Sequence, residues 1–561
     1  MTERLSNRRI RLLLGLFVLV FAGTITRAIW IQGVQASRFE GMAARQHEGT
    51  TLIPAGRGTI FDRTGEPLAI GEQATTVYAD PREVKDPRRV ALAAAKALGV
   101  DPEKLYPALA DRTSHFVYVK RKADPAKAAA LEKLNLPGLG FYAEELRYYP
   151  QRSVAAHVLG YAGLDNKGLE GLERSLDRAL IGKPGSQTTI RDPAGRVIDV
   201  IATKPERAGD DVFLTIDHRI QANAESVLRN TVKRWGAKGG SAVVLDPRTG
   251  AVLAMAVAPS FDANRFGSTP AARRRNRVVT DVYEPGSTFK VVTVAAALSE
   301  KIVSPTTPFT LQTSIRVADR IIHEHEPRPT QRMTVAQILS QSSNVGTITL
   351  AQMLGRSRVE SWIERFGFGN PTGVDAPGET DGLLPGYWSG SSIGNVPIGQ
   401  GIGVTPIQMA AAYAAIANDG VYRTPYLVER VGREWRSRGQ GRRVLSKTVS
   451  AQMMAMLRDV VSAEGGTGAA AAVPGYTVAG KTGTAAKPVP GGYSTSRYVA
   501  SFVGVVPAKD PRLVVLVSID EPNGAIWGGV VAAPAFSEIA RSSLVELEVA
   551  PDATPGTTAT R

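Results

Sequence analysis

The feature that most limits how this 561-residue chain can fold is a serine and a lysine at the start of one apolar segment. Ser287 and Lys290 follow the pair Pro285-Gly286, and the apolar, Ala-rich run Val291–Leu298 that comes next predicts a helix. In the first helical turn, free N–H groups and the positive end of the helix dipole favour negative charge. Positions three apart share a helix face, so the Lys290 amine can reach the Ser287 hydroxyl. Serine needs such an adjacent base to act as a nucleophile at neutral pH.

Two further motifs strengthen this interpretation. A serine and a lysine spaced in this way are weak support alone, because a capping serine followed by a solvated lysine has the same pattern. Ser342-Ser343-Asn344 and Lys481-Thr482-Gly483-Thr484, however, follow in the order and rough spacing of the penicillin-recognising serine acyltransferases. The chain resembles that group, with S-S-N in place of S-D-N in the middle motif. The three segments are therefore expected to meet in one groove.

An apolar segment near the N-terminus predicts a membrane anchor. Residues 10–31 reach the roughly 20 residues that cross a bilayer, with Arg11 and Arg27 extending toward the two interfaces. The basic residues within and beside residues 1–9 predict a cytoplasmic N-terminus. The alternative is a cleaved signal peptide, for which Val34-Gln35-Ala36 is a loose cleavage match. A retained anchor is favoured by the resemblance described below.

Residues 32–235 are expected to form a second region of mixed strands and helices. Alternating patterns predict strands or hairpins at 57–65, 75–79, 187–201 (with a turn at 192–195) and 214–217. Capping signals predict helices at 86–98, 124–134 and 219–235, the first capped by Asp86 and ended by Gly99. Glu170 and Glu173 lie in a distinctive glycine–glutamate run. We interpret these two as structural ionic contacts rather than as an acid/base pair.

Residues 236–548 are expected to form a third region. A hairpin is predicted at 241–257, later strands at 476–484, 498–506 and 513–519, and a closing helix at 534–548. Strands at both ends with helices between them predict an antiparallel sheet flanked by helices, and hence an α+β fold. Residues 549–561 are rich in Thr, Pro, Gly and Ala, which predicts a disordered tail.

Composition narrows the possible functions. The chain has no cysteine, so disulfides and thiolate metal sites are excluded. The net charge of +15 comes from scattered Lys and Arg, and aromatic residues make up only 6%, which disfavours a nucleic-acid-binding function.

One segment could be mistaken for a metal site. His323-Glu324-His325-Glu326 lies in a charged connection that ends in Pro327 and Pro329, so a solvated loop is the favoured interpretation. We predict no metal and no cofactor. Because no other histidine lies near the three motifs, a Ser-His-Asp triad is disfavoured.

The longer motifs identify a narrower resemblance. The chain resembles the class B penicillin-binding proteins, which are monofunctional D,D-transpeptidases, in Arg57–Arg63, Arg147–Pro150, the run around Glu170 and Glu173, and the three motifs above. The segment Asn276–Ser287 resembles the septal, FtsI-like branch. The resemblance implies a single N-terminal transmembrane helix, an elongated α/β pedestal of the dimerisation type, and a penicillin-binding transpeptidase domain.

The resemblance also implies roles for the first two motifs. Ser287 would attack the carbonyl of the penultimate D-Ala of a stem peptide, and an amine from a neighbouring stem would resolve the acyl-enzyme. Lys290 would be the base. Ser342 would relay the proton to the leaving amine, and Asn344 would orient Lys290 and the substrate amide.

For the third motif, the resemblance implies substrate binding. Lys481, with the hydroxyls of Thr482 and Thr484, would bind the terminal carboxylate, and Gly483 would let the ligand backbone approach closely. The oxyanion would be held by the backbone N–H groups of Ser287 and Thr484.

The resemblance further implies partners and a location. The substrates would be stem peptides of lipid II-derived strands, and β-lactams would bind the same site. A SEDS-family, FtsW-like glycosyltransferase and other divisome membrane proteins are the expected partners, because no glycosyltransferase region is found. The expected location is the bacterial inner membrane, with an extracytoplasmic catalytic domain. The alternatives are an elongation transpeptidase, a D,D-carboxypeptidase, a β-lactamase, and a non-catalytic scaffold or β-lactam sensor.

Overall fold

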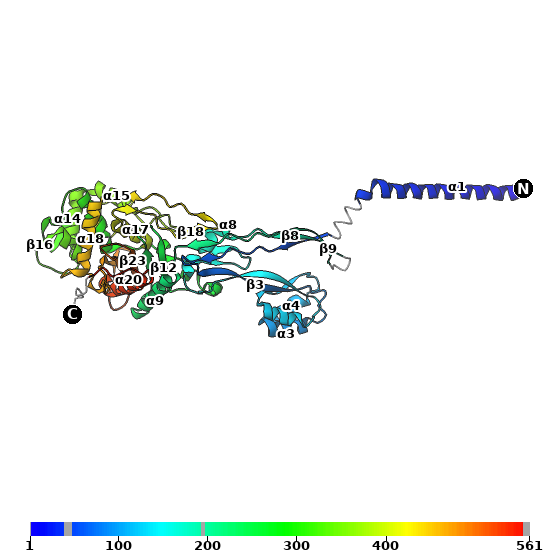
Figure 1. Ribbon diagram of the computed structural model, residues 1–561, viewed down its shortest axis with the longest axis horizontal. Coiled ribbons are helices and arrows are strands. Elements are labelled where there is room, and N and C mark those ends of the chain that lie inside the picture. Colours follow the sequence, from blue (N-terminus) through cyan, green and yellow to red (C-terminus); the bar gives the residue numbers. More distant parts are fainter. Residues whose placement is uncertain (1, 39–47, 192–196, 554–561) are drawn as a thin grey trace. The chain divides into compact units, whose positions relative to one another are not determined.

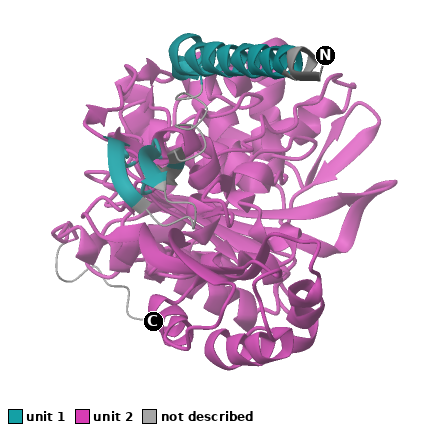
Figure 2. Ribbon diagram, turned by 90° about the vertical axis from the view of Figure 1, so that its right-hand side faces the viewer, with its two compact units in different colours: residues 1–56, 182–208 teal, residues 57–181, 209–561 magenta. Residues whose placement is uncertain are grey.

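The computed structural model describes residues 2–38, 48–191 and 197–553, which fall into two compact units. The first unit comes from residues 1–56 and 182–208, and the second from residues 57–181 and 209–561 (Figure 2).

The first unit contains one long helix and a small sheet. Helix α1 (Thr2–Ile29) continues into a π-helical turn, η1 (Trp30–Val34), and the apolar side chains of the expected span are exposed (Figure 1). Within the described residues it is the one helix long and apolar enough to cross a membrane. The sheet has the antiparallel order β1-β8-β9, formed by Glu48–Ile53, Gly185–Arg191 and Val197–Lys204. The last two strands confirm the expected hairpin, but its turn at 192–195 lies outside the described residues.

The first sheet of the second unit has seven strands. Its order is β19-β18-β10-β2-β3-β4, with β5 also pairing with β3. These strands are Ile60–Phe61 (β2), Pro67–Ala79 (β3), Val117–Ala123 (β4), Leu139–Tyr148 (β5), Val212–Leu214 (β10), Val428–Val431 (β18) and Glu434–Trp435 (β19). Because β10 pairs with β18, the sheet joins strands from both sides of residue 236.

Three helices pack together against strands β3 to β5. They are α3 (Pro87–Leu98), α4 (Pro102–Ala110) and α5 (Pro125–Glu132), and with these strands they enclose a separate apolar core. The expected start and end of α3 are confirmed: Asp86 accepts a hydrogen bond from the Arg89 N–H at 3.0 Å, and Gly99 ends the helix with φ +66°. A left-handed residue at this position is easiest for glycine.

The second sheet is antiparallel and five-stranded, with the order β12-β11-β23-β22-β21. Its strands are Gly239–Leu245 (β11), Val252–Ala258 (β12), Ala479–Val489 (β21), Gly492–Val506 (β22) and Leu513–Asp520 (β23). Side chains alternate between two cores: Val243 and Leu245 belong to one, and Ala242 and Val244 to the other. Helices α9 (His218–Arg234) and α20 (Ala533–Glu546) cover the second face, while α12 (Lys290–Ser299) and α17 (Pro406–Ala417) lie on the first. The expected sheet flanked by helices is confirmed.

Shorter elements complete the second unit. Before α12 they are α6 (Ala156–Leu159), β6 (Tyr161–Ala162), β7 (Gly168–Glu170), α7 (Gly171–Ser175), α8 (Asp177–Leu180), η2 (Ala263–Ser268), α10 (Ala271–Arg274), α11 (Arg277–Thr280) and η3 (Gly286–Phe289). After it come β13 (Pro308–Leu311), β14 (Ser314–Val317), β15 (Arg320–His323), β16 (Gln331–Thr334), α13 (Val335–Ser340), α14 (Asn344–Leu354), α15 (Arg356–Arg365), α16 (Ser392–Asn395), η4 (Val396–Ile398), β17 (Val421–Tyr422), β20 (Arg442–Arg443), α18 (Lys447–Ser462), η5 (Ala469–Ala471) and α19 (Gly528–Val531).

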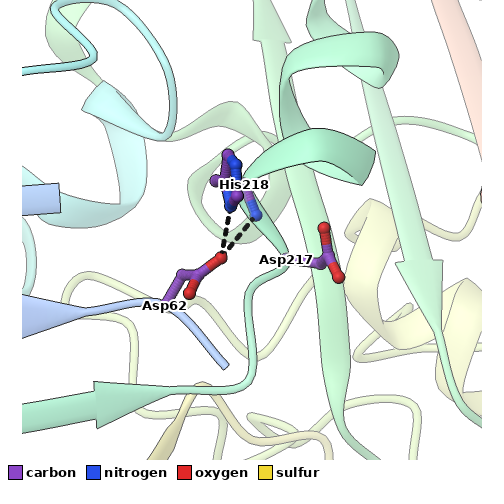
Figure 3. A group of neighbouring side chains, drawn as sticks. All are labelled: Asp62, Asp217 and His218. Carbon is purple, nitrogen blue, oxygen red and sulfur yellow. Dashed lines mark hydrogen bonds and ion pairs between the residues drawn. The ribbon is translucent and has the colours of Figure 1, made fainter. Parts of the chain in front are cut away.

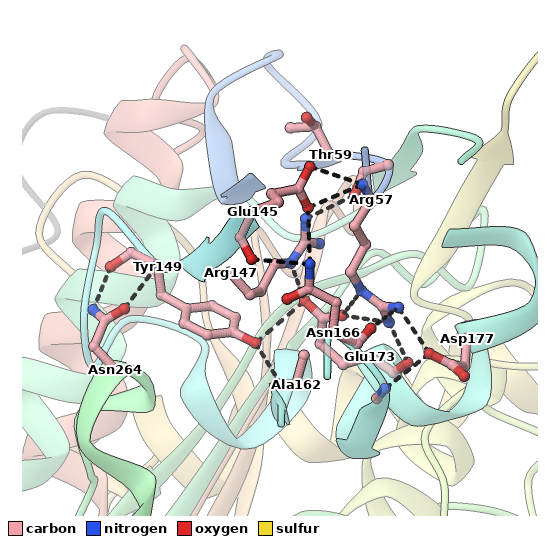
Figure 4. Close-up of polar contacts among 12 residues, drawn as sticks. Arg57, Thr59, Glu145, Arg147, Tyr149, Ala162, Asn166, Glu173, Asp177 and Asn264 are labelled. Atoms are coloured by element: carbon pink, nitrogen blue, oxygen red, sulfur yellow. Dashed lines mark hydrogen bonds and ion pairs between the residues drawn. The ribbon is translucent and has the colours of Figure 1, made fainter. Parts of the chain in front are cut away.

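A buried ionic cluster connects the segment before β2, strand β5 and helix α7. Glu173 has no solvent exposure, and its carboxylate accepts hydrogen bonds from Arg57 at 2.7 Å and from Arg147 at 2.6 Å (Figure 4). Arg57 also pairs with Asp177 at 2.8 Å. The interpretation of Glu173 as a structural ionic contact is confirmed, whereas Glu170 is exposed.

The start of the expected disordered tail is attached to the domain. Asp552 accepts hydrogen bonds from the Thr477 N–H, at 2.7 Å, and from the Thr477 hydroxyl, and the Ala553 N–H donates to the Gly475 carbonyl at 3.1 Å. These bonds differ from the expectation for residues 549–553. Residues 554–561 lie outside the described part.

Candidate active site

Ser287 lies in the short 3₁₀ turn η3, directly before α12. The expected helix over Val291–Leu298 is confirmed by α12. Gly286 is left-handed, with φ +53°, and a side chain there would come within 2.9 Å of the Thr484 carbonyl oxygen. Gly286 thus lets η3 lie close to β21. Ser287 is partly exposed, between two buried neighbours, Gly286 and Thr288. Within the described residues the Ser287 hydroxyl has no hydrogen-bond partner, so it is free to meet a substrate.

Lys290 connects the first motif to the second. Its side chain is fully buried, and its ammonium group donates to the Ser342 carbonyl oxygen at 2.6 Å, the Ser342 Oγ at 3.2 Å and the Asn344 Oδ1 at 2.7 Å. Ser342 has φ +59°, a conformation that is uncommon outside glycine. Its carbonyl and its hydroxyl both lie within reach of Lys290.

The third motif lies on strand β21 beside the nucleophile turn, as the sequence predicts. Lys481 is fully buried, and its ammonium group lies 3.3 Å from both the carbonyl oxygen and the Oγ1 of Thr482. The Thr484 Oγ1 accepts a hydrogen bond from the Gly528 N–H at 3.2 Å. A side chain at Gly483 would come within 3.0 Å of the Pro285 carbonyl oxygen. The neighbouring Ser501 and Thr288 side chains and the Pro285 carbonyl therefore leave no room for a side chain at this position.

Burial sets the protonation of both lysines. Burial and then the charge of Lys481 hold the pKa of Lys290 well below its ordinary value, while the Glu324 carboxylate acts in the opposite direction. Burial also lowers the pKa of Lys481, to about 7. A neutral amine at Lys290 is therefore accessible near neutral pH, as a general base requires.

Glu324 is a site residue that sequence reasoning missed. Its carboxylate accepts hydrogen bonds from the Ser343 hydroxyl and, at 2.8 Å, from the Asn344 N–H. The side chain is buried, and Arg328 lies 3.7 Å away. The interpretation of His323–Glu326 as a solvated loop is wrong for Glu324, because the free donors at the start of α14 attract its carboxylate. The sequence signal was an acidic residue among alternating charges, which is common in exposed loops.

His325 lies in the same segment as Glu324. Its ring meets the Trp527 ring edge-on, with 4.4 Å between the centroids. Burial, followed by the charge of Lys290, lowers the pKa of His325. Trp527 precedes Gly528, whose N–H bonds to the Thr484 hydroxyl, so the His325 ring packs against a segment that contacts the third motif.

Potential metal ligands gather elsewhere. Among the described residues, Asp62, Asp217 and His218 have donor atoms within 4.8 Å of one another, and the group does not include His323 or His325 (Figure 3). One Asp62 oxygen accepts from the His218 N–H at 3.1 Å and lies 2.6 Å from its Nδ1, and the other accepts from Thr64 and Glu66. Asp217 caps α9. Protein N–H donors thus occupy these carboxylates, which accounts for the cluster structurally.

Comparisons with known proteins agree with this geometry. Residues 240–541 match the family model described as "Penicillin binding protein transpeptidase domain", and residues 52–214 match "Penicillin-binding Protein dimerisation domain". The chain is 35% identical to "Peptidoglycan D,D-transpeptidase FtsI" of Escherichia coli strain K12, over 97% of this chain and 93% of that protein. It is also 35% identical to "Stage V sporulation protein D" of Bacillus subtilis, over 98% of this chain and 88% of that protein.

A solved structure is similar as well. Penicillin-binding protein 3 of Mycobacterium tuberculosis, crystallised with aztreonam, is 31% identical to this chain, with a TM-score of 0.71, over 90% of this chain and 98% of that one.

Proposed function

Because the chain belongs to the class B penicillin-binding proteins, we propose that it is a serine-type peptidoglycan D,D-transpeptidase that uses Ser287 as its nucleophile. It binds peptidoglycan stem peptides and β-lactams. Ser287 attacks the carbonyl of the penultimate D-Ala, the terminal D-Ala leaves, and an amine of a neighbouring stem attacks the resulting ester. The products are a new peptide cross-link and a free Ser287 hydroxyl.

The observation that carries this proposal is the contact of Lys290 with both Ser342 and Asn344. A buried amine with a depressed pKa, one helical turn from a free serine, is suited to remove the serine proton. Ser342 lies within reach of the same amine and relays the proton to the leaving group. Asn344 holds Lys290 and orients the substrate amide.

The third motif supplies substrate binding. Lys481 attracts the terminal carboxylate, and the hydroxyls of Thr482 and Thr484 bond to it. The backbone N–H groups of Ser287 and Thr484 hold the oxyanion, and losing one such donor typically costs about 3–4 kcal/mol of transition-state stabilisation. The contact of Gly286 and Gly483 with the facing segments supports this pairing of η3 and β21.

Covalent labelling tests the nucleophile. Ser287→Ala should abolish labelling by a fluorescent penicillin, because it removes the proposed nucleophile, whereas the Ser342 hydroxyl is already bonded to Lys290. The matched control is Ser299→Ala at the other end of α12, which should label like the unaltered protein. Labelling that persists in Ser287→Ala would show that another residue is acylated.

We further propose that the enzyme works at the division septum. The similarity to FtsI of Escherichia coli supports a role in septation rather than in elongation. Another similar protein, of Bacillus subtilis, is named for sporulation. Depletion in cells should give filaments; rounded cells would indicate elongation. Normal division supported by Ser287→Ala would instead favour a non-catalytic scaffold or β-lactam sensor.

The chain is a single-pass membrane protein, and the following topology is proposed. Residues 1–9 are cytoplasmic, 10–31 cross the inner membrane, 32–235 form the pedestal, 236–548 form the extracytoplasmic transpeptidase domain, and 549–561 form a tail. The basic residues before the span support this orientation. The anchor and pedestal are proposed to bind an FtsW-like glycosyltransferase and other divisome membrane proteins. A cytoplasm-specific reporter fused to the N-terminus tests the orientation.

A further inference from the structure

A row of paired side chains crosses the first sheet of the second unit and ends at its edge. Phe61 on β2 lies opposite Phe213 on β10, which lies opposite Arg430 on β18. Arg430 in turn lies opposite Trp435 on the last strand, β19. The two phenylalanine rings stack with 4.9 Å between their centroids, and the Arg430 guanidinium lies 3.7 Å from the Phe213 ring centroid and 5.9 Å from that of Trp435. Such cross-strand neighbours hold one another in place, so the row is a preformed surface that ends in an exposed indole.

A cavity of about 420 Å³ beside this row is rich in arginine. The residues that line it are Arg63, Phe213, Glu429, Arg430, Arg433 and Trp435. Its one carboxylate, that of Glu429, already pairs with Arg438 at 2.6 Å, and the first of its three arginines pairs with Asp217 at 3.4 Å. Arg430 and Arg433 have no carboxylate partner within the described residues. The cavity therefore carries an excess of positive charge, which an anionic ligand would compensate through charge-assisted hydrogen bonds.

Strand β19 forms an open edge beside the cavity. It is the last strand of its sheet, and in the described part of the chain no strand pairs with its outer side. Both of its residues are exposed. Side chains alternate along a strand, and accordingly Trp435 lines the cavity whereas Glu434 does not. The unpaired N–H and C=O groups of such an edge are a template for a further strand, and Arg433, directly before β19, repels a basic strand and attracts an acidic one.

We propose that an extended acidic segment of a partner protein adds to this sheet as a strand beside β19. Its backbone pairs with the outer edge of β19, and one of its side chains extends the row past Trp435. A carboxylate on the same face enters the cavity and bonds to Arg430 and Arg433. Arg430 is held by the Phe213 ring and by its bond to the Gly432 carbonyl oxygen at 2.6 Å, so its remaining N–H groups are already oriented. No residue of the three catalytic motifs lines this cavity, so the site is additional to the transpeptidase function.

The strand edge distinguishes an acidic peptide from other anions. Inorganic phosphate and lipid headgroups can bond to the arginines, but they cannot form a strand ladder with the backbone of β19. A neutral strand can pair with that backbone but gains nothing from the arginines. Only an acidic strand uses both features, because its backbone meets the edge while alternate side chains point into the cavity.

Peptide binding to the full-length protein in a neutral detergent tests the proposal. The probe is a fluorescein-labelled peptide of alternating Glu and Thr, about eight residues long, whose carboxylates share one face when it is extended. Fluorescence anisotropy at physiological ionic strength should show that it binds about tenfold or more tightly than the same peptide with Gln in place of Glu, because the neutral peptide lacks the charge-assisted bonds. The Glu peptide methylated on its backbone nitrogens, which cannot donate to β19, should also bind about tenfold more weakly.

Arg433→Gln should weaken binding of the Glu peptide about fivefold and leave the Gln peptide unaffected, because an exposed ion pair is lost. The control is Arg88→Gln, which removes an exposed arginine of α3 and should change neither affinity. Circular dichroism checks that both variants are folded. Equal binding of the Glu and Gln peptides to the unaltered protein would overturn the proposal, as would undiminished binding of the methylated peptide or full affinity in Arg433→Gln. Displacement of the Glu peptide by inorganic phosphate or by phosphatidylglycerol vesicles at equal charge concentration would also overturn it, and would assign the cavity to phosphate groups.

Discussion

Two fully buried lysines and one buried glutamate set the chemistry of the site at the scale of single residues. Burial lowers the pKa of both lysines, and the charge of Lys481 lowers the pKa of Lys290 further. The Glu324 carboxylate raises the pKa of Lys290 and so partly offsets this lowering. It accepts hydrogen bonds from the Ser343 hydroxyl and the Asn344 N–H of the second motif. The position of Asn344, and through it of Lys290, therefore depends on a residue outside the three motifs.

Glu324→Ala should slow acylation by a penicillin about tenfold or more, because Asn344 loses a bond to a charged acceptor worth about 1.5–3 kcal/mol. Glu324→Gln, which keeps an acceptor, should restore much of the rate. The control is Glu326→Ala, in the exposed part of the same loop. The measurement is the second-order rate constant of fluorescent labelling, and unchanged labelling in Glu324→Ala would refute this positioning role.

Acylation should show a bell-shaped pH dependence. Lys290 is a base only when neutral, so the rate rises with pH and levels off well below pH 10.5. Lys481 attracts the carboxylate only when protonated, and with a pKa of about 7 this attraction is lost as the pH rises further. Rate constants between pH 5 and pH 10 provide the measurement, to be repeated with Lys481→Arg, which should remove the falling limb. A rate that climbs steadily to pH 10 would contradict both assignments.

At the scale of elements, the site depends on how segments distant in sequence pack against one another. Glycines at positions 286 and 483 let η3 and β21 approach more closely than any side chain would allow. Farther from the site, Glu173 at α7 binds Arg57 before β2 and Arg147 on β5 (Figure 4). The Glu173 carboxylate thus bonds to both buried guanidinium groups, and Asp177 also pairs with that of Arg57.

Glu173→Ala should destabilise the protein by about 3–5 kcal/mol, because it leaves the buried Arg147 cation without its carboxylate partner and leaves Arg57 with Asp177 alone. The control is Glu170→Ala, three residues earlier and exposed, which should change stability by less than about 0.5 kcal/mol. Denaturant midpoints followed by fluorescence measure the difference. Similar midpoints for the two variants would mean that the buried cluster contributes little to stability.

At the scale of the whole molecule, membrane attachment and catalysis belong to different parts of the chain. Helix α1 is the candidate membrane span, and the catalytic motifs all lie after residue 280. The exposed apolar side chains of α1 have no partner among the described residues. By contrast, the transpeptidase sheet and its helices enclose their own cores. Membrane attachment and catalysis should therefore be separable.

Deletion of residues 1–35 should move the protein from the membrane pellet to the soluble fraction while penicillin labelling is retained, because the three motifs all follow residue 280. Ultracentrifugation with labelling of both fractions is the measurement. Mass spectrometry of the full-length protein serves as the control. A mature chain that begins near Ala36 would support a cleaved signal peptide and contradict the anchor.

Local sequence signals were sufficient for many of the elements and for the three motifs whose residues were predicted to form the site, but not for Glu324. Apolar alternation predicted the strands of the second sheet, the Asp86-Pro87 start and Gly99 end predicted α3, and three short motifs predicted which residues meet. Each signal is carried by neighbouring residues, whose preferred dihedral angles and faces do not depend on the rest of the chain.

What only the tertiary structure decided depends on contacts between residues far apart in sequence. A glutamate among alternating charges gives no sign that it will be buried against Ser343 and Asn344, because the donors that hold it come from another segment. Likewise, β18 joins a sheet whose other strands mostly precede it by more than 200 residues. The depressed pKa values of Lys290 and Lys481 also arise only on folding, because burial lowers both and the nearby Lys481 charge lowers that of Lys290 further.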